Sequence, residues 1–308
     1  MPILDLREGP KTSFLDEKVS ASDLDFAFIA SSPREIPPFL GPTRTSGQGQ
    51  SACFVIDLRA GEERAEPQIP LRQRVLSVPF LDRGFPAEDK EDGGKDRVYV
   101  SAHPATIVIS ALLLRLAACF PLKSVVANIL SSVSTIGSRG IEELQKQTLN
   151  LLSFQKIPRQ VFGAQLAFNL LSRPGGTGGS ELQALENHLR KQIKDYLQGR
   201  VPLPALRLFQ APVYHSLAVS LYIETSQPVA PEKAGEAWQG GRVQTRRQSQ
   251  ASPTPVEVAG SDEILVDSVI ADPDHPTGLW IWAVADDLRL AAVNAVEVAE
   301  SLCHRIAV

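Results

Sequence analysis

The sequence predicts an α/β protein with two sheets, and three observations lead to this prediction. Short runs rich in valine and isoleucine alternate with helical patterns in the first part of the chain, which is typical of crossover units in a parallel sheet. The chain has 308 residues, of which 43% are hydrophobic, so it is long for one core but suits two domains. From about residue 205 onward, long apolar runs favour antiparallel strands in a second sheet.

The first part of the chain carries four short apolar runs that predict strands: 2–6, 25–30, 52–58 and 97–102. The last run leads into a predicted helix over 104–119, because Pro104 suits a first helical turn and the following residues are almost all apolar. Between these elements, the charged and glycine-containing stretch 86–97 predicts a solvated loop.

The middle of the chain predicts a strand over 124–134 and an amphipathic helix over 140–153. Ile141, Leu144, Thr148 and Leu151 share one face of that helix. A strand-like apolar run then covers 161–171, and the glycine-rich stretch 173–179 predicts a loop. A helix is expected from Ser180 to about Leu197, with Ser180 as its N-terminal cap.

The last third predicts one or two long strands over 205–225, antiparallel within a second sheet, and a mobile polar loop over 238–253. Strand-like patterning returns over 263–285. The apolar run from 278 then leads into a helix that ends near 302, with Leu288, Ala292, Ala295 and Ala299 on one stripe.

Charge and cysteine content limit the function. The net charge of −4 gives no reason to expect a nucleic-acid or anionic-membrane partner. Cys53, Cys119 and Cys303 lie far apart, show no metal-type spacing and are odd in number, so we expect buried thiols, no metal site and a reducing cytoplasm. No run is long enough to span a membrane, and the first residues lack the pattern of a signal peptide.

Four motifs occur in the same order as in a known family: VIDLRAGEERAEPQIPL (55–71), VSTIGSRGIEEL (133–144), FGAQLAFN (162–169), and PTPVEVAG (253–260) followed by the apolar strand and helix. This chain resembles the aspartate-semialdehyde dehydrogenases. The resemblance implies a Rossmann-like nucleotide-binding domain over 1–122, completed by a C-terminal helix (287–308). It also implies an α+β dimerisation domain with a mixed sheet over 123–286, and either a homodimer or a heterodimer with an active paralogue.

The residues that the family uses for catalysis are replaced. The cysteine of its Asn-Pro-x-Cys turn falls at Ala105, or at Pro104 in a second register, and its glutamine falls at Ser131. Its arginine falls at Gln210 and its histidine at Leu217. Neither an amide nor a leucine reproduces a guanidinium clamp or a proton transfer.

Two other histidines are weighed for a functional role. His215 stands in for the missing histidine only if the register shifts; on a strand it shares a face with Leu217. His103 precedes the helix start, where capping is preferred over proton shuttling. The histidines at 188, 275 and 304 are interpreted as surface residues.

Cofactor binding is also expected to be lost, although the family uses NADP. Residues 2–6 resemble the family's second strand, so its first strand and the Gly-x-Gly-x-x-Gly turn are expected to be missing. Deleting that central strand exposes two internal edges unless the sheet closes up or a partner fills the gap. Asn294 is the one retained candidate for cofactor contact, and 173–179 is only a weak match to a phosphate loop.

The resemblance and the replacements together predict a catalytically inactive relative that acts as a dimerising or regulatory subunit. The alternative is an NAD(P)-dependent semialdehyde dehydrogenase of amino-acid biosynthesis, with an altered active site or a truncated gene.

Overall fold

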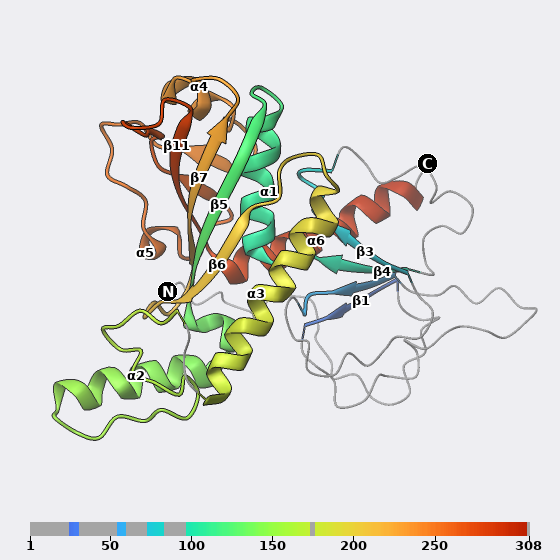
Figure 1. Ribbon diagram of the computed structural model, residues 1–308. Helices are drawn as coiled ribbons and strands as arrows, with labels where there is room; N and C mark the ends of the chain where they lie inside the picture. Colours follow the sequence, from blue (N-terminus) through green and yellow to red (C-terminus); the bar gives the residue numbers. More distant parts are fainter. Residues whose placement is uncertain (1–24, 31–53, 60–72, 83–96, 173–175, 307–308) are drawn as a thin grey trace, which may run out of the picture.

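The structure is a computed structural model that describes residues 25–30, 54–59, 73–82, 97–172 and 176–306. The strand predicted over 2–6, the loop predicted over 86–97 (apart from its last residue) and Cys53 lie outside the described residues. The described part contains two sheets with helices between and around them (Figure 1). The predicted α/β fold with one parallel and one mixed sheet is therefore confirmed.

The first sheet has four parallel strands in the order β1-β2-β4-β3. Its strands are β1 (Phe26–Ile29), β2 (Phe54–Asp57), β3 (Gln73–Ser77) and β4 (Arg97–Ser101). Three of them were predicted, and β3 was not. Its sequence QRVLS has only two apolar residues, so its strand conformation depends on pairing with β4.

The second sheet is mixed and follows the order β6-β5-β7-β11-β9-β8, with β10 paired to β11. Its strands are β5 (Leu122–Ser131), β6 (Ala205–Gln210), β7 (Leu217–Thr225), β8 (Val243–Thr245), β9 (Ile264–Val266), β10 (Ile270–Ala271) and β11 (Gly278–Ala285). The run 205–225 forms two strands, one of the two predicted alternatives. They run in opposite directions, and β5 lies between them. The strand predicted over 124–134 ends at Ser131, and a 3₁₀ helix, η5 (Val133–Ile136), follows.

Helices α1 (Pro104–Ala117) and α3 (Gly176–Leu197) cover the inner face of the second sheet and share one apolar core with it. Alternate residues of β5, such as Val125, Ala127 and Ile129, are buried in that core. The opposite face remains partly open, since 40% of Val126 and 42% of Trp280 are exposed. The short helix α4 (Pro231–Glu236) lies beside the edge strand β8 (Figure 1). The short helix α5 (Pro255–Val258) packs on the sheet through Val258, which contacts apolar side chains of β7, β9 and β11.

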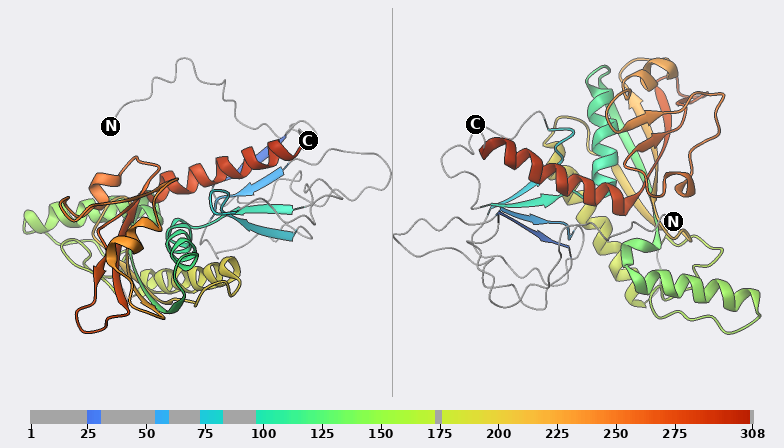
Figure 2. Two further views of the ribbon diagram at one scale, coloured as in Figure 1. Left: turned by 90° about the horizontal axis from the view of Figure 1, so that it is seen from above. Right: turned by 180° about the vertical axis from the view of Figure 1, so that it is seen from behind.

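The C-terminal helix α6 (Asp287–Ile306) leaves the second sheet and crosses the first one (Figure 2). Its residues Ala295, Val298 and Leu302 pack against Phe54 and other apolar side chains of β2 and β4. The predicted return of this helix to the first sheet is confirmed. The predicted stripe is wrong at its start, because Leu288 and Ala292 are exposed. The first turn also carries the buried carboxylate of Asp287, which is described below.

Helix α2 (Ser138–Leu152) and the segment after it form a lobe at the end of the second sheet. The predicted helix and its face are confirmed, because Ile141, Leu144 and Leu151 contact Phe162 and its neighbours. The strand predicted over 161–171 is wrong. Side chains of α2 bind several backbone N–H groups of this segment, and only Leu171 pairs with a strand, as an isolated bridge.

Two loop predictions are corrected. Helix α3 begins at Gly176, so part of 173–179 is helical and Ser180 lies inside the helix rather than at its cap. The segment 238–253 is not a mobile loop. Trp238 is fully buried, its Nε1 donates to the carbonyl oxygen of Leu112 at 2.9 Å, and β8 pairs with β9.

Two searches of the described residues had negative results. No helix among them is both long enough and apolar enough to cross a bilayer. They also contain no group of three or more His, Cys, Asp or Glu side chains arranged to hold a metal ion.

Candidate functional site

Two of the four residues predicted to stand at the family's catalytic positions lie side by side where β5 and β6 end. Ser131 is the last residue of β5 and pairs in register with Gln210, the last residue of β6. Both are buried, and Gln210 Nε2 donates to the carbonyl oxygen of Ser131 at 2.9 Å. Leu217 begins β7 opposite Ala285 and is buried in the main core. These side chains serve packing and backbone pairing, and none presents a charge or a proton donor to solvent.

The junction between β4 and α1 holds Ala105, the residue predicted to stand at the family's cysteine position, and it is fully buried. His103 caps α1, because its Nδ1 accepts a hydrogen bond from the N–H of Ala105 at 3.1 Å. Its own backbone N–H donates to Gln192 of α3 at 2.8 Å. Burial, with a smaller contribution from His188, lowers the pKa of His103 to about 3, so the ring is neutral. The capping role is confirmed.

Thr106, in the first turn of α1, is a third residue on which the family's cysteine position can fall. When His103 and Pro104 are aligned with the first two residues of the Asn-Pro-x-Cys turn, the cysteine position falls at Thr106. Its Oγ1 is buried and has no hydrogen-bond partner among the described residues. A hydroxyl needs an adjacent base to act as a nucleophile, and no described residue makes a hydrogen bond with this one. The family's cysteine therefore falls at Pro104, Ala105 or Thr106, and none of these residues has a thiol.

A buried carboxylate joins the segments around the family's catalytic positions. Asp287 Oδ2 accepts hydrogen bonds from the hydroxyls of Ser132 at 2.8 Å and Ser134 at 2.6 Å. Asp287 Oδ1 accepts from the N–H groups of Ser216 and Leu288, both at 3.1 Å. The carboxylate therefore fastens η5, the connection from β6 to β7, and α6 to one another.

Asp287→Ala is expected to lower the free energy of unfolding by at least about 2 kcal/mol, because it leaves the buried N–H of Ser216 and the two hydroxyls without their acceptor. Asp287→Asn keeps one acceptor oxygen and should cost less. Urea unfolding measures both, and Asp262→Ala, at a largely exposed ion pair with Arg289, serves as the control. An alanine variant at position 287 no less stable than this control would contradict the expectation.

Asn294, the retained cofactor candidate, lies where β3 and β4 end. Its Nδ2 donates to the carbonyl oxygen of Ser77 at 3.0 Å and to Ser101 Oγ at 2.9 Å. Its Oδ1 is buried and has no partner among the described residues. Ligands of open α/β sheets bind at the carboxyl ends of the strands, so this amide is suitably placed, but its donor groups already serve the fold. Its contact with a cofactor stays a prediction.

The positions of the remaining candidate side chains correct several predictions. His215 is exposed in the bend before β7, and Ser216 follows with a φ of 74°, so the argument from strand geometry does not apply to it. Cys119 and Cys303 are exposed rather than buried. His188 is half-buried and lies near Gln192, whereas His275 is exposed, as predicted, beside Asp272. The side chain of His304 lies outside the described residues.

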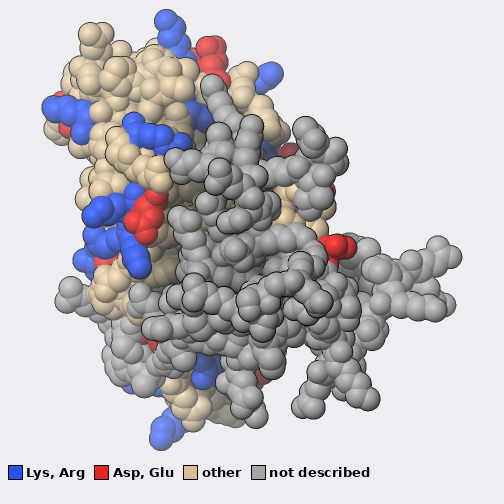
Figure 3. Space-filling view, turned by 90° about the vertical axis from the view of Figure 1, so that its right-hand side faces the viewer, with Lys and Arg blue, Asp and Glu red and all other residues tan. Residues whose placement is uncertain are grey.

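On the described part of the face shown in Figure 3, Asp and Glu side chains lie among Lys and Arg side chains. Glu186 of α3 illustrates such pairing, because it contacts Arg190 and Arg207 and accepts a hydrogen bond from the N–H of Leu208. Burial by itself would raise the pKa of Glu186, but these hydrogen bonds and positive charges lower it. The carboxylate is therefore ionised and links α3 to β6.

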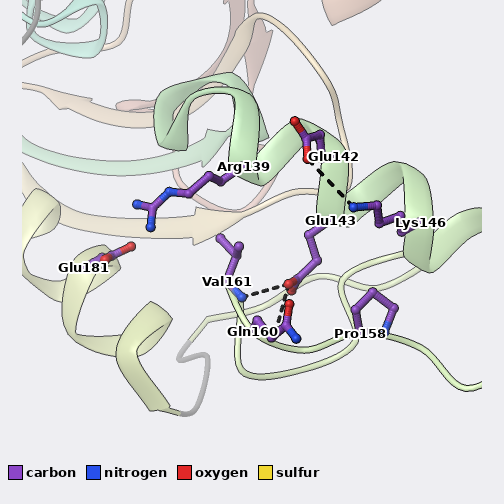
Figure 4. A pocket seen from close by; sticks show the side chains of 8 residues that line it. All are labelled: Arg139, Glu142, Glu143, Lys146, Pro158, Gln160, Val161 and Glu181. Atoms are coloured by element: carbon purple, nitrogen blue, oxygen red, sulfur yellow. Dashed lines mark hydrogen bonds and ion pairs between the residues drawn. The ribbon is translucent and has the colours of Figure 1, made fainter.

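Two polar residues of α2, also missed from the sequence, hold the segment that follows this helix. Glu143 accepts hydrogen bonds from the N–H groups of Gln160 and Val161 at 2.8 Å and of Phe162 at 3.1 Å (Figure 4). Gln147 accepts from Leu166 and Ala167 and donates to two carbonyl oxygens. A sequence signal was present, because both residues are polar and lie beside the apolar face of α2. Glu143 also lines a cavity of about 290 Å³.

This chain is similar in sequence and in fold to semialdehyde dehydrogenases. Residues 113–290 match the family "Semialdehyde dehydrogenase, dimerisation domain". An aspartate-semialdehyde dehydrogenase of Rickettsia bellii is 31% identical over 96% of this chain and 86% of its own. A USG-1 protein homolog of Pseudomonas aeruginosa is 29% identical over 56% of this chain and 52% of its own.

Among solved structures, a probable aspartate-semialdehyde dehydrogenase from Pseudomonas aeruginosa superposes with a TM-score of 0.68 at 26% identity. The superposition covers 82% of this chain and 72% of the Pseudomonas aeruginosa chain. The family match spans more than half of the sequence, and the Rickettsia relative is covered over most of its length. The chain therefore belongs to the aspartate-semialdehyde dehydrogenase family.

Proposed function

We propose that this protein is a catalytically silent member of the family that acts as a dimerising or regulatory subunit. The observation that carries the proposal is the hydrogen bond of Gln210, the residue predicted at the family's arginine position. Its side-chain amide is buried and donates to the backbone carbonyl oxygen of Ser131 in β5. Ala105 and Leu217 are likewise packed into the core. A substrate carboxylate would find no guanidinium there, and an aldehyde would find no thiolate.

A dehydrogenase assay tests the proposal. The purified protein is expected to show no phosphate-dependent reduction of NADP by aspartate semialdehyde and to form no thioester, while an active relative assayed in parallel does both. Turnover above background that a thiol reagent abolishes would contradict the proposal and favour a dehydrogenase with an altered site. The double variant Cys119→Ser and Cys303→Ser is the control, because both thiols are exposed and would react with the reagent.

We also propose that the chain binds NAD or NADP no more tightly than millimolar. The support is the absence of a Gly-x-Gly-x-x-Gly turn from the sequence and the commitment of the Asn294 Nδ2 donors to β3 and β4. Calorimetry with either nucleotide provides the test. A micromolar site that is lost in Asn294→Ala would contradict it.

We further propose a division into a domain over 1–122 with 287–308, and a dimerisation domain over 123–286. Packing of α6 on the first sheet supports the first part, and the mixed sheet supports the second. The open face of that sheet carries Val126, Tyr222 and Trp280, whose tyrosine and tryptophan rings lie 4.7 Å apart. An isologous dimer would cover this face in a homodimer or in a pair with an active paralogue.

Light scattering at low micromolar concentration is expected to give about twice the monomer mass of 33.4 kDa. Obligate dimers of this kind bury upwards of roughly 2,000 Å², and a charge at the centre of such a contact is costly. Trp280→Glu should therefore shift the mass toward the monomer. Val296→Glu, which is half-exposed on α6, should not. A monomeric wild-type protein would exclude the homodimer.

A further inference from the structure

An exposed apolar patch lies at the C-terminal end of α2. Leu149, Leu152 and Phe154 are 56%, 66% and 99% exposed, and they lie outside the apolar cluster that the buried face of α2 forms with Phe162. Leu149 and Leu152 are three residues apart and are therefore neighbours on the helix surface, and Phe154 follows just after the helix. These three residues form the arm patch. Large apolar side chains that gather on a surface commonly mark a site of interaction.

The backbone of Phe154 adopts a conformation that is strained for a phenylalanine. Its N–H donates to the carbonyl oxygen of Leu151 at 3.3 Å. The N–H of Gln155 donates to the carbonyl oxygen of Asn150 at 2.7 Å. These two hydrogen bonds form the Schellman motif, in which the residue after the helix cap is left-handed and is usually glycine. Phe154 stands at this position with a φ of 55°.

The ring of Phe154 does not offset this strain within the folded chain, because it buries almost no surface there. Glycine would form the same turn without the strain. Phe168 in the same lobe repeats the combination, with a φ of 59° and 69% of its surface exposed. Strained residues that persist without a gain for the fold point to a function elsewhere. An exposed aromatic ring favours burial against another molecule.

The position of α2 indicates which molecule this is. Helix α2 projects from the end of the second sheet, on the side away from α1 and the first sheet (Figures 1 and 2). The partly open face of the second sheet lies on the same side, because α1 and α3 cover its other face. On the open face, one apolar row crosses β5, β7, β11 and β10 in register: Val126, Tyr222, Trp280 and Ile270. A molecule that covers this row would therefore also reach the arm patch.

The apolar row is too small by itself to hold an obligate dimer. It exposes roughly 300 Å² of apolar surface, whereas each partner of an obligate homodimer buries about 650 Å² of apolar surface. The arm patch adds roughly 400 Å². Together the two surfaces reach the size that a stable dimer needs.

We propose that the arm patch packs against a second copy of this chain, beside the open face of the second sheet. In an isologous dimer every contact occurs twice, so α2 of each copy holds the other copy. Phe154 is the anchor of this contact, because a few buried aromatic side chains carry most of the binding energy of an interface. The inference rests on the homodimer proposed above and adds a second contact surface to it.

Phe154→Gly in the full chain tests the proposal through two measurements. Sedimentation of a dilution series is expected to show a dimer dissociation constant raised about tenfold or more, because an aromatic anchor is lost from both copies. In the Trp280→Glu background, where the chain is expected to be monomeric, the same change should raise Tm by about 1–3 °C, because glycine adopts this φ without strain. Phe154→Tyr keeps the ring and should leave the dissociation constant close to that of the wild type.

Gln198→Gly is the matched control. Gln198 is exposed and has a φ of 47°, so glycine relieves the same kind of strain and should raise Tm in the same way. It lies near the hydrogen bond from Tyr196 to Asp82, beside the first sheet, so the dissociation constant should not change. Equal weakening of the dimer in both glycine variants would count against the arm patch.

Other outcomes would overturn the proposal in distinguishable ways. An unchanged dissociation constant in Phe154→Gly would show that the arm patch is not part of the interface, while the dimer through the sheet face would stand. A fall in Tm in the monomeric background would show that Phe154 serves its own fold. A monomeric wild-type protein would exclude the homodimer itself, and the contact of the arm patch with it.

Discussion

Glu143→Ala is expected to lower the free energy of unfolding by about 3 kcal/mol, because it leaves three backbone N–H groups without their acceptor and a buried donor without a partner costs about 1–3 kcal/mol. The carboxylate is buried and accepts hydrogen bonds from the N–H groups of Gln160, Val161 and Phe162. Alanine leaves these donors without an acceptor and opens a cavity beside α2. Urea unfolding measures the loss, and hydrogen exchange should show faster exchange of these three amides than of amides in β7.

Glu142→Ala is the matched control, because it changes the same residue type one position earlier at a mostly exposed site. It should alter stability by less than about 0.5 kcal/mol. Glu143→Gln keeps one acceptor oxygen and should fall between the two variants. If Glu143→Ala and Glu142→Ala were equally stable, the carboxylate of Glu143 would not be what holds the segment 158–167 against α2.

Acidification is expected to destabilise the protein through His103. The pKa of this residue is lowered from 6.5 to about 3 in the folded state, so the unfolded chain binds more protons whenever the pH lies between these values. Well above pH 6.5, the free energy of unfolding therefore does not depend on this group. As the pH falls from 6.5 toward 3, the free energy of unfolding decreases by about 1.4 kcal/mol per pH unit. Protonation also removes the Nδ1 acceptor that caps α1.

The comparison with His103→Asn isolates this effect from the titration of carboxylates. Asparagine also caps helices but does not ionise in this range. Between pH 6.5 and 4.5, the wild type should lose more stability than the variant, by about 1.4 kcal/mol for each pH unit. Parallel curves for the two proteins would show that His103 is not the residue that titrates.

The sequence alone determined the elements whose patterning is local. The strands β1, β2, β4 and β11 and the helices α1 and α2 appear near their predicted positions, because apolar periodicity reports directly which residues face a core. The four motifs, taken in order, also identified the family before any geometry was known. The proposed replacement of the family's catalytic side chains at Ala105 and Leu217 likewise rests on the sequence motifs alone.

The tertiary structure alone decided how polar side chains are used. The segment 161–171 has the apolar pattern of a strand, yet Glu143 and Gln147 bind its backbone N–H groups and hold it in a non-strand conformation. The segment 238–253 has the polar pattern of a mobile loop, yet buried Trp238 anchors its start. Each such hydrogen bond joins groups far apart in the chain, so its partner is specified only when the elements pack together.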